Sequence, residues 1–430
     1  MTVTRFKSYP ETKDSGIEWL GEIPAHWDIR RMKQMTGKTG SGKTPRGGAE
    51  AYVTEGIMLI RSQNVLTGAL SLDNVVFIDE ATDREMANTR VHEGDVLLNI
   101  TGASLGRSCV ARLQGHDANV NQHVCIIRPR SELTESRYLA YEVMSPAVQC
   151  QIFETQTGVS RDAVNFEQVD SLQVAKPPRR EQQAIADFLD RETAKIDALV
   201  EKKERLIEVL QEKHSALITH AVIKGLDPDV PMKDSGIEWL GQIPAHWDVK
   251  KFSWLIKRSN AGEVIDRGYW GGGDELLYSC QRTPIWSTFE RFPSERRTQS
   301  GDLLVTRNGT PYVHLPEPGS IYTNVVQRVQ MTGETTTRFA HTVLSTAAST
   351  LIGFGDIIES FNMGTWRQLW LPIPPMDEQA QITRILDRET AKIDALIAKV
   401  QEAIERLKEY RTALISAAVT GKIDVREAVQ

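Results

Sequence analysis

The sequence is poor in cysteine and has no long apolar run. Its four cysteines, Cys109, Cys125, Cys150 and Cys280, show no CxxC spacing. This pattern argues against a zinc site or a disulfide framework and favours free thiols in a reducing compartment. The apolar runs are shorter than the roughly 18 residues needed to cross a bilayer, and the first residues lack the apolar stretch of a secretory signal. We therefore expect a cytoplasmic protein without a membrane segment.

Motifs of catalysis are also lacking. The nine histidines show no HExxH arrangement, and the sequence has no GxSxG, no DPPY-like motif and no glycine-rich dinucleotide fingerprint. We therefore expect no catalytic residue, no cofactor and no metal site in this chain. Strong charge of one sign is lacking as well, because 51 basic and 57 acidic residues leave a net charge of −6. Contact with DNA would then need a locally basic face or a surface shared with a partner.

The sequence contains one pattern twice. Residues 14–28 read DSGIEWLGEIPAHWD and residues 234–248 read DSGIEWLGQIPAHWD, so only Glu22 and Gln242 differ. A second segment, LDRETAKIDAL, occurs unchanged at 189–199 and 386–396. A period of about 200 residues is the size of a domain rather than of a solenoid repeat. The repeats frame two dissimilar inserts, 29–176 and 249–373, and predict a pseudo-two-fold molecule with two different recognition surfaces.

The two inserts share the pattern of one mixed α/β fold. Apolar runs between Gly- and Asn-rich turns predict strands, and an amphipathic stretch after them predicts a helix. Both inserts contain a Gly-Asp strand, GDVLLNITG at 94–102 and GDLLVTRNG at 301–309, and an Asn-Val-x-Gln segment at 119–122 and 324–327. In the first insert we expect strands at Ile57–Arg61, Val75–Ile78, Val96–Ile100 and His123–Ile127, and a helix over Leu133–Phe153. In the second we expect strands at Leu276–Ser279, Leu303–Arg307 and Val325–Met331, and a helix near His341–Leu351.

Each insert ends at a double proline, Pro177-Pro178 or Pro374-Pro375, which stops the chain and can start a helix. A heptad pattern follows each of them and predicts two antiparallel coiled-coil helices, the first from about Glu181 to Val222. The alternative is that each helix packs only on its own domain. The expected seam residues are Ile185, Leu189, Ile196, Leu199, Leu206, Leu210 and Leu217 in the first helix, and Ile382, Leu386, Ile393, Leu396, Val400, Leu407 and Leu414 in the second.

Residues Gly37–Thr44 match the phosphate-binding loop pattern GxxxxGK[ST]. Such a loop needs an apolar strand before it and a helix after it. Here Met32–Thr36 is not an apolar strand, and Pro45 with two glycines follows the motif. We therefore interpret the segment as a basic loop that contacts DNA phosphates, and nucleotide binding remains an alternative. The phosphate-contacting residues would be Lys38, Lys43 and Arg46.

The insert loops are rich in side chains that read base edges. Arginine pairs with guanine, and asparagine or glutamine pairs with adenine, through two hydrogen bonds each. For every such residue the alternative is a solvated surface position or a role in a turn. The candidates are Arg61, Gln63, Asn64, Arg107, Asn121 and Arg161 in the first insert, and Gln281, Arg282, Arg307, Asn308, Arg328 and Arg367 in the second.

Three features together resemble the DNA specificity subunit of Type I restriction–modification systems. They are the paired WLGxIPxHW motifs, the GDVLLN and GDLLVT segments, and the stretches PPRREQQAIADFLDRET and PPMDEQAQITRILDRET. The resemblance covers nearly the whole chain. It implies a non-catalytic subunit of a site-specific DNA endonuclease and adenine methyltransferase complex. It also implies that two target-recognition domains each read one half of a bipartite double-stranded DNA target. The two helices would space these domains and dock two methyltransferase subunits, and motor–nuclease subunits would join them. Those partners would use S-adenosylmethionine, ATP and Mg²⁺.

The resemblance implies four segments. The first target-recognition domain would span 1–178 and the first coiled-coil helix 179–226, and the second domain would span 227–375 and the second helix 376–430. Two other functions stay open at this point. A P-loop nucleotide hydrolase with a coiled-coil arm would turn over ATP as an isolated chain. A coiled-coil adaptor that joins two protein ligands would show no sequence-selective DNA binding.

Overall fold

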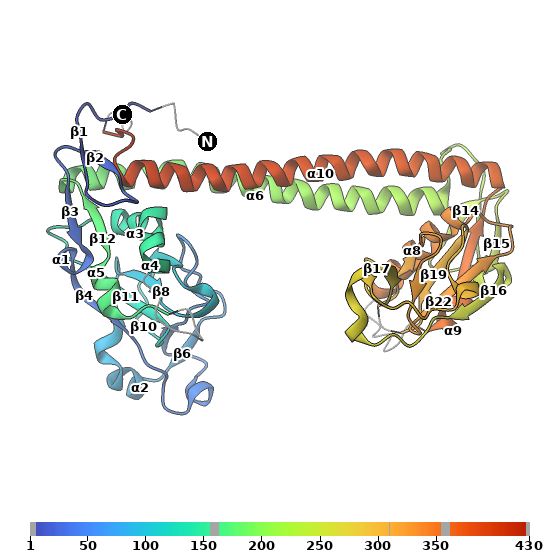
Figure 1. Ribbon diagram of the computed structural model, residues 1–430, viewed down its shortest axis with the longest axis horizontal. Coiled ribbons are helices and arrows are strands. Elements are labelled where there is room, and N and C mark those ends of the chain that lie inside the picture. The colour runs from blue at the N-terminus through green and yellow to red at the C-terminus, as the bar shows by residue number, and fades with distance from the viewer. Residues whose placement is uncertain (1–5, 155–162, 309, 354–361, 427–430) are drawn as a thin grey trace. The chain divides into compact units, whose positions relative to one another are not determined.

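The computed structural model describes residues 6–154, 163–308, 310–353 and 362–426 (Figure 1). Contacts divide the chain into two compact units. The first unit consists of Met1–Glu204 with Glu402–Gln430, and the second unit is Arg205–Gln401. Each unit therefore holds one insert, one copy of the repeated N-terminal motif and a part of both long helices. The four-segment division expected from the sequence stays a prediction.

Short paired strands frame the first insert. Strands β1 (Thr12–Asp14) and β2 (Glu22–Pro24) form an antiparallel hairpin. Strand β3 (Asp28–Arg31) pairs with β12 (Gln173–Lys176), which follows the insert. Because Asp28 lies opposite Lys176 in this ladder, the insert leaves and rejoins its frame at one place.

Two four-stranded sheets make up the first insert. The first sheet has the order β4–β11–β8–β9, and the second has the order β6–β5–β10–β7 with β10 parallel to β5. The strands of the first sheet are β4 (Thr36–Ser41), β8 (Val96–Asn99), β9 (Ser108–Val110) and β11 (Val124–Pro129). Those of the second are β5 (Ile57–Ile60), β6 (Val76–Ile78), β7 (Arg90–Val91) and β10 (Ala118–Val120). The short helices are α1 (Met32–Met35), α2 (Glu80–Glu85) and α5 (Phe166–Ser171).

Two helices rather than one follow the sheets of the first insert. They are α3 (Ser136–Met144) and α4 (Pro146–Glu154), so the single helix expected over Leu133–Phe153 is wrong. Ser145 is extended with ψ of 147°, and Pro146 has no N–H to continue the α3 ladder. Both helices still share one apolar core with the first sheet. Its members include Val96, Leu98, Ile127, Leu139, Val143, Val148 and Ile152.

The second insert repeats this fold. Its four-stranded sheet has the order β16–β22–β19–β20, which matches β4–β11–β8–β9, and β17 runs parallel to β21 as β5 does to β10. Every expected strand overlaps an observed one, so the prediction that both inserts share one fold is confirmed. The elements are β13 (Met232–Asp234), β14 (Gln242–Pro244), β15 (Asp248–Lys251), α7 (Phe252–Leu255), β16 (Ile256–Ala261), β17 (Trp270–Tyr278), β18 (Ile285–Ser287), β19 (Asp302–Thr306), β20 (Val313–His314), β21 (Ile321–Tyr322), β22 (Val326–Met331), α8 (Thr337–Gly353), α9 (Met363–Gln368) and β23 (Trp370–Ile373).

The Asn-Val-x-Gln segments are not structural equivalents. Val120 pairs with Ile60 of β5, whereas Tyr322 pairs with Tyr278 of β17 at the corresponding place. Asn119 therefore lies inside a strand, and its amide is buried. Asn324 follows a strand. The similarity of these segments in the sequence is a coincidence of local composition.

The two long helices are α6 (Arg179–Lys224) and α10 (Met376–Val419). They run antiparallel in each unit (Figure 1). In the first unit Arg411 Nε lies 2.9 Å from Asp197 Oδ1, and in the second unit His214 Nε2 lies 3.7 Å from Asp394 Oδ1. The 46 residues of α6 make a helix of about 69 Å. Both the long helices and their antiparallel pairing were predicted correctly.

The seam between these helices differs from the prediction at three leucines. Ile196, Leu210 and Val400 are buried as expected. Leu199, Leu206 and Leu396 are instead 47%, 42% and 44% exposed. The adjacent residues Val200, Ile207 and Ile397 take the half-buried positions. One residue turns a helix by about 100°, which moves each leucine out of the seam and onto the outer face.

The repeated motif attaches each insert to both long helices. In the first unit His26 Nε2 and Glu181 Oε2, at the start of α6, are 2.9 Å apart. A Cβ on Gly421, just past the end of α10, would lie 3.2 Å from the Trp27 ring and 2.2 Å from Pro24. Lys422 Nζ donates to the Glu22 carbonyl at 2.5 Å.

The second unit repeats these contacts with the helices exchanged. His246 Nε2 lies 2.8 Å from Glu378 Oε2 at the start of α10. A Cβ on Gly225, just past the end of α6, would lie 3.3 Å from the Trp247 ring. Lys224 Nζ donates to the Gln242 carbonyl at 2.5 Å. Each insert is therefore held by the beginning of one long helix and the end of the other.

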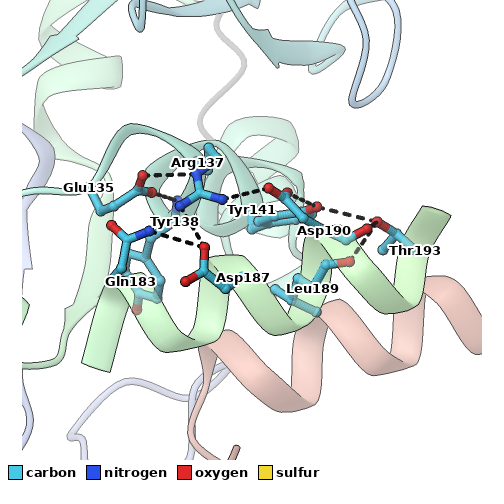
Figure 2. A network of polar contacts seen from close by, with 9 residues as sticks. All are labelled: Glu135, Arg137, Tyr138, Tyr141, Gln183, Asp187, Leu189, Asp190 and Thr193. Atoms are coloured by element: carbon cyan, nitrogen blue, oxygen red, sulfur yellow. Dashed lines mark hydrogen bonds and ion pairs between the residues drawn. The ribbon is translucent and has the colours of Figure 1, made fainter. Parts of the chain in front are cut away.

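A network of polar contacts joins α3 to α6 in the first unit (Figure 2). Arg137 donates to Glu135 Oε1 at 3.0 Å, to Asp187 Oδ1 at 2.8 Å and to Asp190 Oδ2 at 2.7 Å. Tyr141 Oη donates to the other oxygen of Asp190 at 2.8 Å. These bonds fix the orientation of the first insert on its helix. Among the described helices of both units, none is long and apolar enough to cross a bilayer.

Candidate nucleic-acid interface

Three loops of the first insert line a shallow pocket of about 440 Å³. One loop follows β5, the second follows β8, and the third leads into β11. Its lining residues are mostly small or polar, and they include both hydrogen-bond donors and acceptors. The residues are Ser62, Gln63, Thr101, Gly102, Ala103, Ser104, Arg107 and His123. We call this surface the loop pocket.

Hydrogen bonds fix the histidine of the loop pocket. His123 Nδ1 lies 2.6 Å from Thr101 Oγ1, and its Nε2 lies 2.9 Å from Gln122 Nε2. The backbone N–H of His123 donates to Asn121 Oδ1 at 3.1 Å. Gln63 and Arg107 are exposed beside it. Both ring nitrogens of His123 are thus engaged within the protein, whereas the amide of Gln63 and the guanidinium of Arg107 match donors and acceptors on base edges.

The structure brings two predicted residues, Gln63 and Arg107, into the loop pocket, and Asn121 lies just behind it. Sequence reasoning missed Thr101, Ser104 and His123. A signal for them existed, because Thr101 is the last residue but one of the GDVLLNITG segment and His123 follows the Asn-Val-Asn-Gln segment. Thr101 directly follows the predicted strand Val96–Ile100, and His123 is the first residue of the predicted strand His123–Ile127.

Asn64 corrects a prediction. It is 1% exposed, and its Oδ1 accepts a hydrogen bond from the Arg61 N–H at 3.0 Å. Its Nδ2 donates to the carbonyls of Ser71 and Asp73 at 3.2 and 3.3 Å. Both ends of the amide are therefore used by the loop itself, and Asn64 is not available to read a base. Arg61 is half-buried, and its Nη2 donates to the Asn74 carbonyl at 3.0 Å.

The phosphate-binding loop pattern has the wrong structure for nucleotide binding. Its first part lies in β4, where Lys38 is opposite Arg128 of the neighbouring strand β11 in the antiparallel ladder. Burial and nearby Arg128 lower the pKa of Lys38. After the motif the chain forms only a short 3₁₀ turn, Gly48–Ala51, instead of an α-helix. The structure thus contradicts the alternative of a P-loop hydrolase.

The remaining basic residues of this segment lie at the surface. Lys43 is exposed, and Arg46 is 91% exposed with a long ion pair of 3.8 Å to Glu85. Arg161 lies outside the described residues.

The second insert places its candidates on the corresponding loops. Gln281 and Arg282 follow β17, as Gln63 follows β5, and both are exposed. Arg307 and Asn308 follow β19. The Arg307 N–H donates to the Val325 carbonyl at 2.7 Å, which repeats the bond from the Ile100 N–H to the His123 carbonyl at 3.0 Å. The same loops thus carry different side chains in the two inserts.

Arg328 corrects a second prediction. Its side chain is 5% exposed and forms a buried ion pair with Asp302, with Nε 2.5 Å from Oδ2. A further bond of 3.3 Å from its Nη1 reaches the Arg296 carbonyl. Arg328 is thus a core residue of the sheet and not a base reader. Arg367 is exposed on α9, and its Nη2 donates to Ser259 Oγ at 3.2 Å.

No group of three or more histidines, cysteines or carboxylates that could hold a metal occurs in the described part of the chain. Its candidate surfaces are polar loops with side chains that form hydrogen bonds. Two like inserts that carry such loops, together with the paired long helices, match the arrangement expected from the sequence for a protein with two recognition surfaces.

Comparison with known proteins identifies the class. Residues 24–209 match the family model for the Type I restriction modification DNA specificity domain. The putative type I restriction enzyme MjaX specificity subunit of Methanocaldococcus jannaschii is 21% identical, over 95% of this chain and 96% of its own length. The type I restriction enzyme EcoKI specificity subunit of Escherichia coli K12 is 20% identical, over 94% and 90%.

Solved structures show the same fold. A chain from a structure of type I R-M system assembly aligns with a TM-score of 0.72 at 14% identity, over 93% of this chain and 99% of its own. The HsdS subunit of Thermoanaerobacter tengcongensis aligns with a TM-score of 0.51 at 14% identity, over 93% and 98%. The chain is thus similar over almost its whole length to type I restriction enzyme specificity subunits, and it shares its fold with solved chains of such systems. The matched family model describes a DNA specificity domain, and the relatives are named as specificity subunits of restriction enzymes.

Proposed function

We propose that each insert reads one half of a bipartite DNA target. One observation supports this most directly: the same three loops occupy the same places in both folds but carry different side chains. Thr101 of the first insert corresponds to Asn308 of the second, two residues after the last paired residue of β8 and β19. Ile100 likewise corresponds to Arg307. Like scaffolds with unlike loops suit two readers of unlike sequences.

The candidate base readers that remain after the corrections are polar. Gln63 and Arg107 of the first insert and Gln281, Arg282, Asn308 and Arg367 of the second are exposed, whereas Arg61, Asn121 and Arg307 are half-buried. Lys43 and Arg46 would contact the phosphate backbone, which positions the protein without reading sequence.

The repeated helix segment supports docking of two copies of one protein partner. LDRETAKIDAL is identical in α6 and α10, yet six of its eleven side chains are exposed in both copies. Core packing does not require exposed residues to match, whereas binding the same partner twice does. The exposed pairs are Arg191 and Arg388, Ala194 and Ala391, Lys195 and Lys392, Asp197 and Asp394, Ala198 and Ala395, and Leu199 and Leu396.

The partners follow from the family. We propose two methyltransferase subunits on these segments and motor–nuclease subunits joined to them, in the cytoplasm. S-adenosylmethionine, ATP and Mg²⁺ would be bound by those partners.

The long helices would set the spacing between the two half-sites. Adding four residues to both helices would lengthen each by about 6 Å. The half-sites should then stay unchanged while the spacer between them grows. Retained methylation with an unchanged spacer would refute this role.

A domain exchange within the chain tests the two-reader function. Asp28 pairs with Lys176, and Asp248 pairs with Ile373, so each insert can be cut at neighbouring backbone positions. Residues 249–373 should therefore replace 29–176 without opening the frame. Sequencing of methylated DNA should then show the second half-site twice, in inverted orientation, and the reciprocal exchange should show the first half-site twice. An unchanged target in either protein would contradict the proposal.

A further inference from the structure

Two stretches of this acidic protein are locally basic, and they occupy the same place in both units. Residues 29–49 contain six basic residues and no acidic residue before Glu50. Residues 249–262 contain four basic residues and no acidic residue before Glu263. The net charge of the whole chain is −6, so the charge of these two runs is opposite in sign to that of the chain. The first forms β3, α1 and β4, and the second forms β15, α7 and β16. We call them the basic ribbons.

Many side chains of the basic ribbons are free to meet a ligand. Lys33 and Lys43 are exposed in the first ribbon, and Lys257 and Arg258 are exposed in the second. None of these four forms an ion pair with a described residue. By contrast, Arg30 pairs with Asp28 at 3.1 Å, and Lys250 pairs with Glu334. Each ribbon therefore offers uncompensated positive charge.

Each basic ribbon ends against the loops that carry the candidate readers. The Gly42 N–H donates to the Asn121 carbonyl at 3.1 Å. A Cβ on Gly42 would lie 1.5 Å from the Val120 carbonyl oxygen, so only glycine permits this approach. Gly262 repeats the contact, with its Cβ position 2.0 Å from the Tyr322 carbonyl oxygen. The ribbons are thus continuous with the reading surfaces in both inserts.

We propose that the two basic ribbons bind the DNA backbone next to each half-site. The proposal rests on the DNA-reading function above and extends the phosphate contact given there for Lys43 to a surface that is repeated in both units. A duplex whose base edges meet the loop pocket must bring its phosphates to the surfaces that border that pocket, because phosphates line both edges of each groove. The repeated placement beside the reading loops favours DNA over an acidic protein partner.

The test compares charge-neutral variants in the full chain bound to its methyltransferase partner. The first variant is Lys33→Gln with Lys43→Gln, and the second is Lys257→Gln with Arg258→Gln. The matched control is Lys13→Gln with Lys233→Gln, which removes two exposed lysines from the repeated hairpins instead. Affinity for the target duplex is measured from low to high salt, and the methylated motif is sequenced.

Each lost phosphate contact should reduce the magnitude of the slope of log K for DNA binding against log salt concentration by about 0.9. Each double variant should therefore show a slope smaller in magnitude by about 1.8. The methylated motif should stay the same, and the control should keep the parent slope. An unchanged slope would overturn the proposal. Normal DNA affinity with loss of the methyltransferase partner would assign the ribbons to protein binding and also overturn it. A changed motif would show that the ribbons read bases. Absence of selective binding by the parent complex would refute the proposed function itself.

Discussion

Arg137 and Asp190 form an ion pair of 2.7 Å, and Arg338 and Asp387 repeat it at the same distance in the second unit. The surroundings of the two pairs differ. Arg137 is 23% exposed and also bonds to Asp187, whereas Arg338 is 60% exposed. Three residues before the paired aspartate, the first helix has Asp187 and the second has Arg384. The first insert is thus attached to its helix by more polar bonds than the second.

This difference predicts unequal costs of mutation. Arg137→Ala leaves three carboxylates without their cation and should lower the free energy of unfolding by about 2–3 kcal/mol. Arg338→Ala removes an exposed pair and should cost less than about 1 kcal/mol. Urea denaturation of the two purified variants, with the parent chain as reference, measures both values. Equal losses would contradict the assignment.

Glu142 predicts that stability depends on pH. Burial raises the pKa of this carboxyl from 4.5 to about 8, against the opposing hydrogen bonds from Tyr138 Oη and the Ala175 N–H. Between these pH values the folded protein keeps a proton that the unfolded chain releases. The stability should therefore fall as pH rises from about 5 to 8, by up to about 1.4 kcal/mol per pH unit.

Glu142→Gln is the matched variant for this prediction. Its amide oxygen can accept the same two bonds without taking on charge. Thermal unfolding between pH 5 and 8 should show a flatter profile for the variant and a higher melting temperature at pH 8. Parallel profiles for variant and parent would show that Glu142 does not titrate in this range.

Variants of Arg107 and Asn64 should distinguish an effect on base recognition from an effect on the stability of the loop. Arg107→Ala should leave the fold intact and relax one position of the first half-site, at a cost of about 1–3 kcal/mol in binding. Asn64→Ala should instead lower the melting temperature, because it leaves buried backbone groups without partners. Sequencing of methylated sites and thermal unfolding give the two readouts. The second half-site serves as the internal control for both variants.

Leu199 and Leu396 test the docking surface. Leu199→Glu should remove one of the two methyltransferase copies, and the double variant with Leu396→Glu should remove both. Leu206→Glu is the control, because Leu206 is exposed to a similar degree but lies outside the repeated segment. The mass of the purified complex gives the number of copies bound. Equal loss with Leu206→Glu would show that the repeated segment is not special.

The sequence predicted the repeats and the paired long helices better than it predicted which polar side chains are free to read bases. Identical repeats and heptads indicated the paired helices, because these patterns follow directly from helical geometry. The predicted seam was wrong at Leu199 and Leu206. An apolar residue directly follows each of these leucines, and the sequence alone does not show which of the two faces the partner helix. Asn64 and Arg328 were misassigned for another reason. Their residue types suit base reading, but only tertiary contacts show that one holds a loop and the other pairs with Asp302 in the core.

Each insert is held by the beginning of one long helix and the end of the other, and this arrangement has a consequence for biosynthesis. The core that surrounds Tyr9 and Trp27 includes Leu414, Val419 and Val425, from the last part of the chain. The second unit, in contrast, is one continuous segment that ends at Gln401. A ribosome therefore releases every part of the second unit before it finishes the first. The first unit can complete its core only after this last part of the chain has been synthesised. A premature stop there would therefore remove part of the core of the unit that carries the first insert.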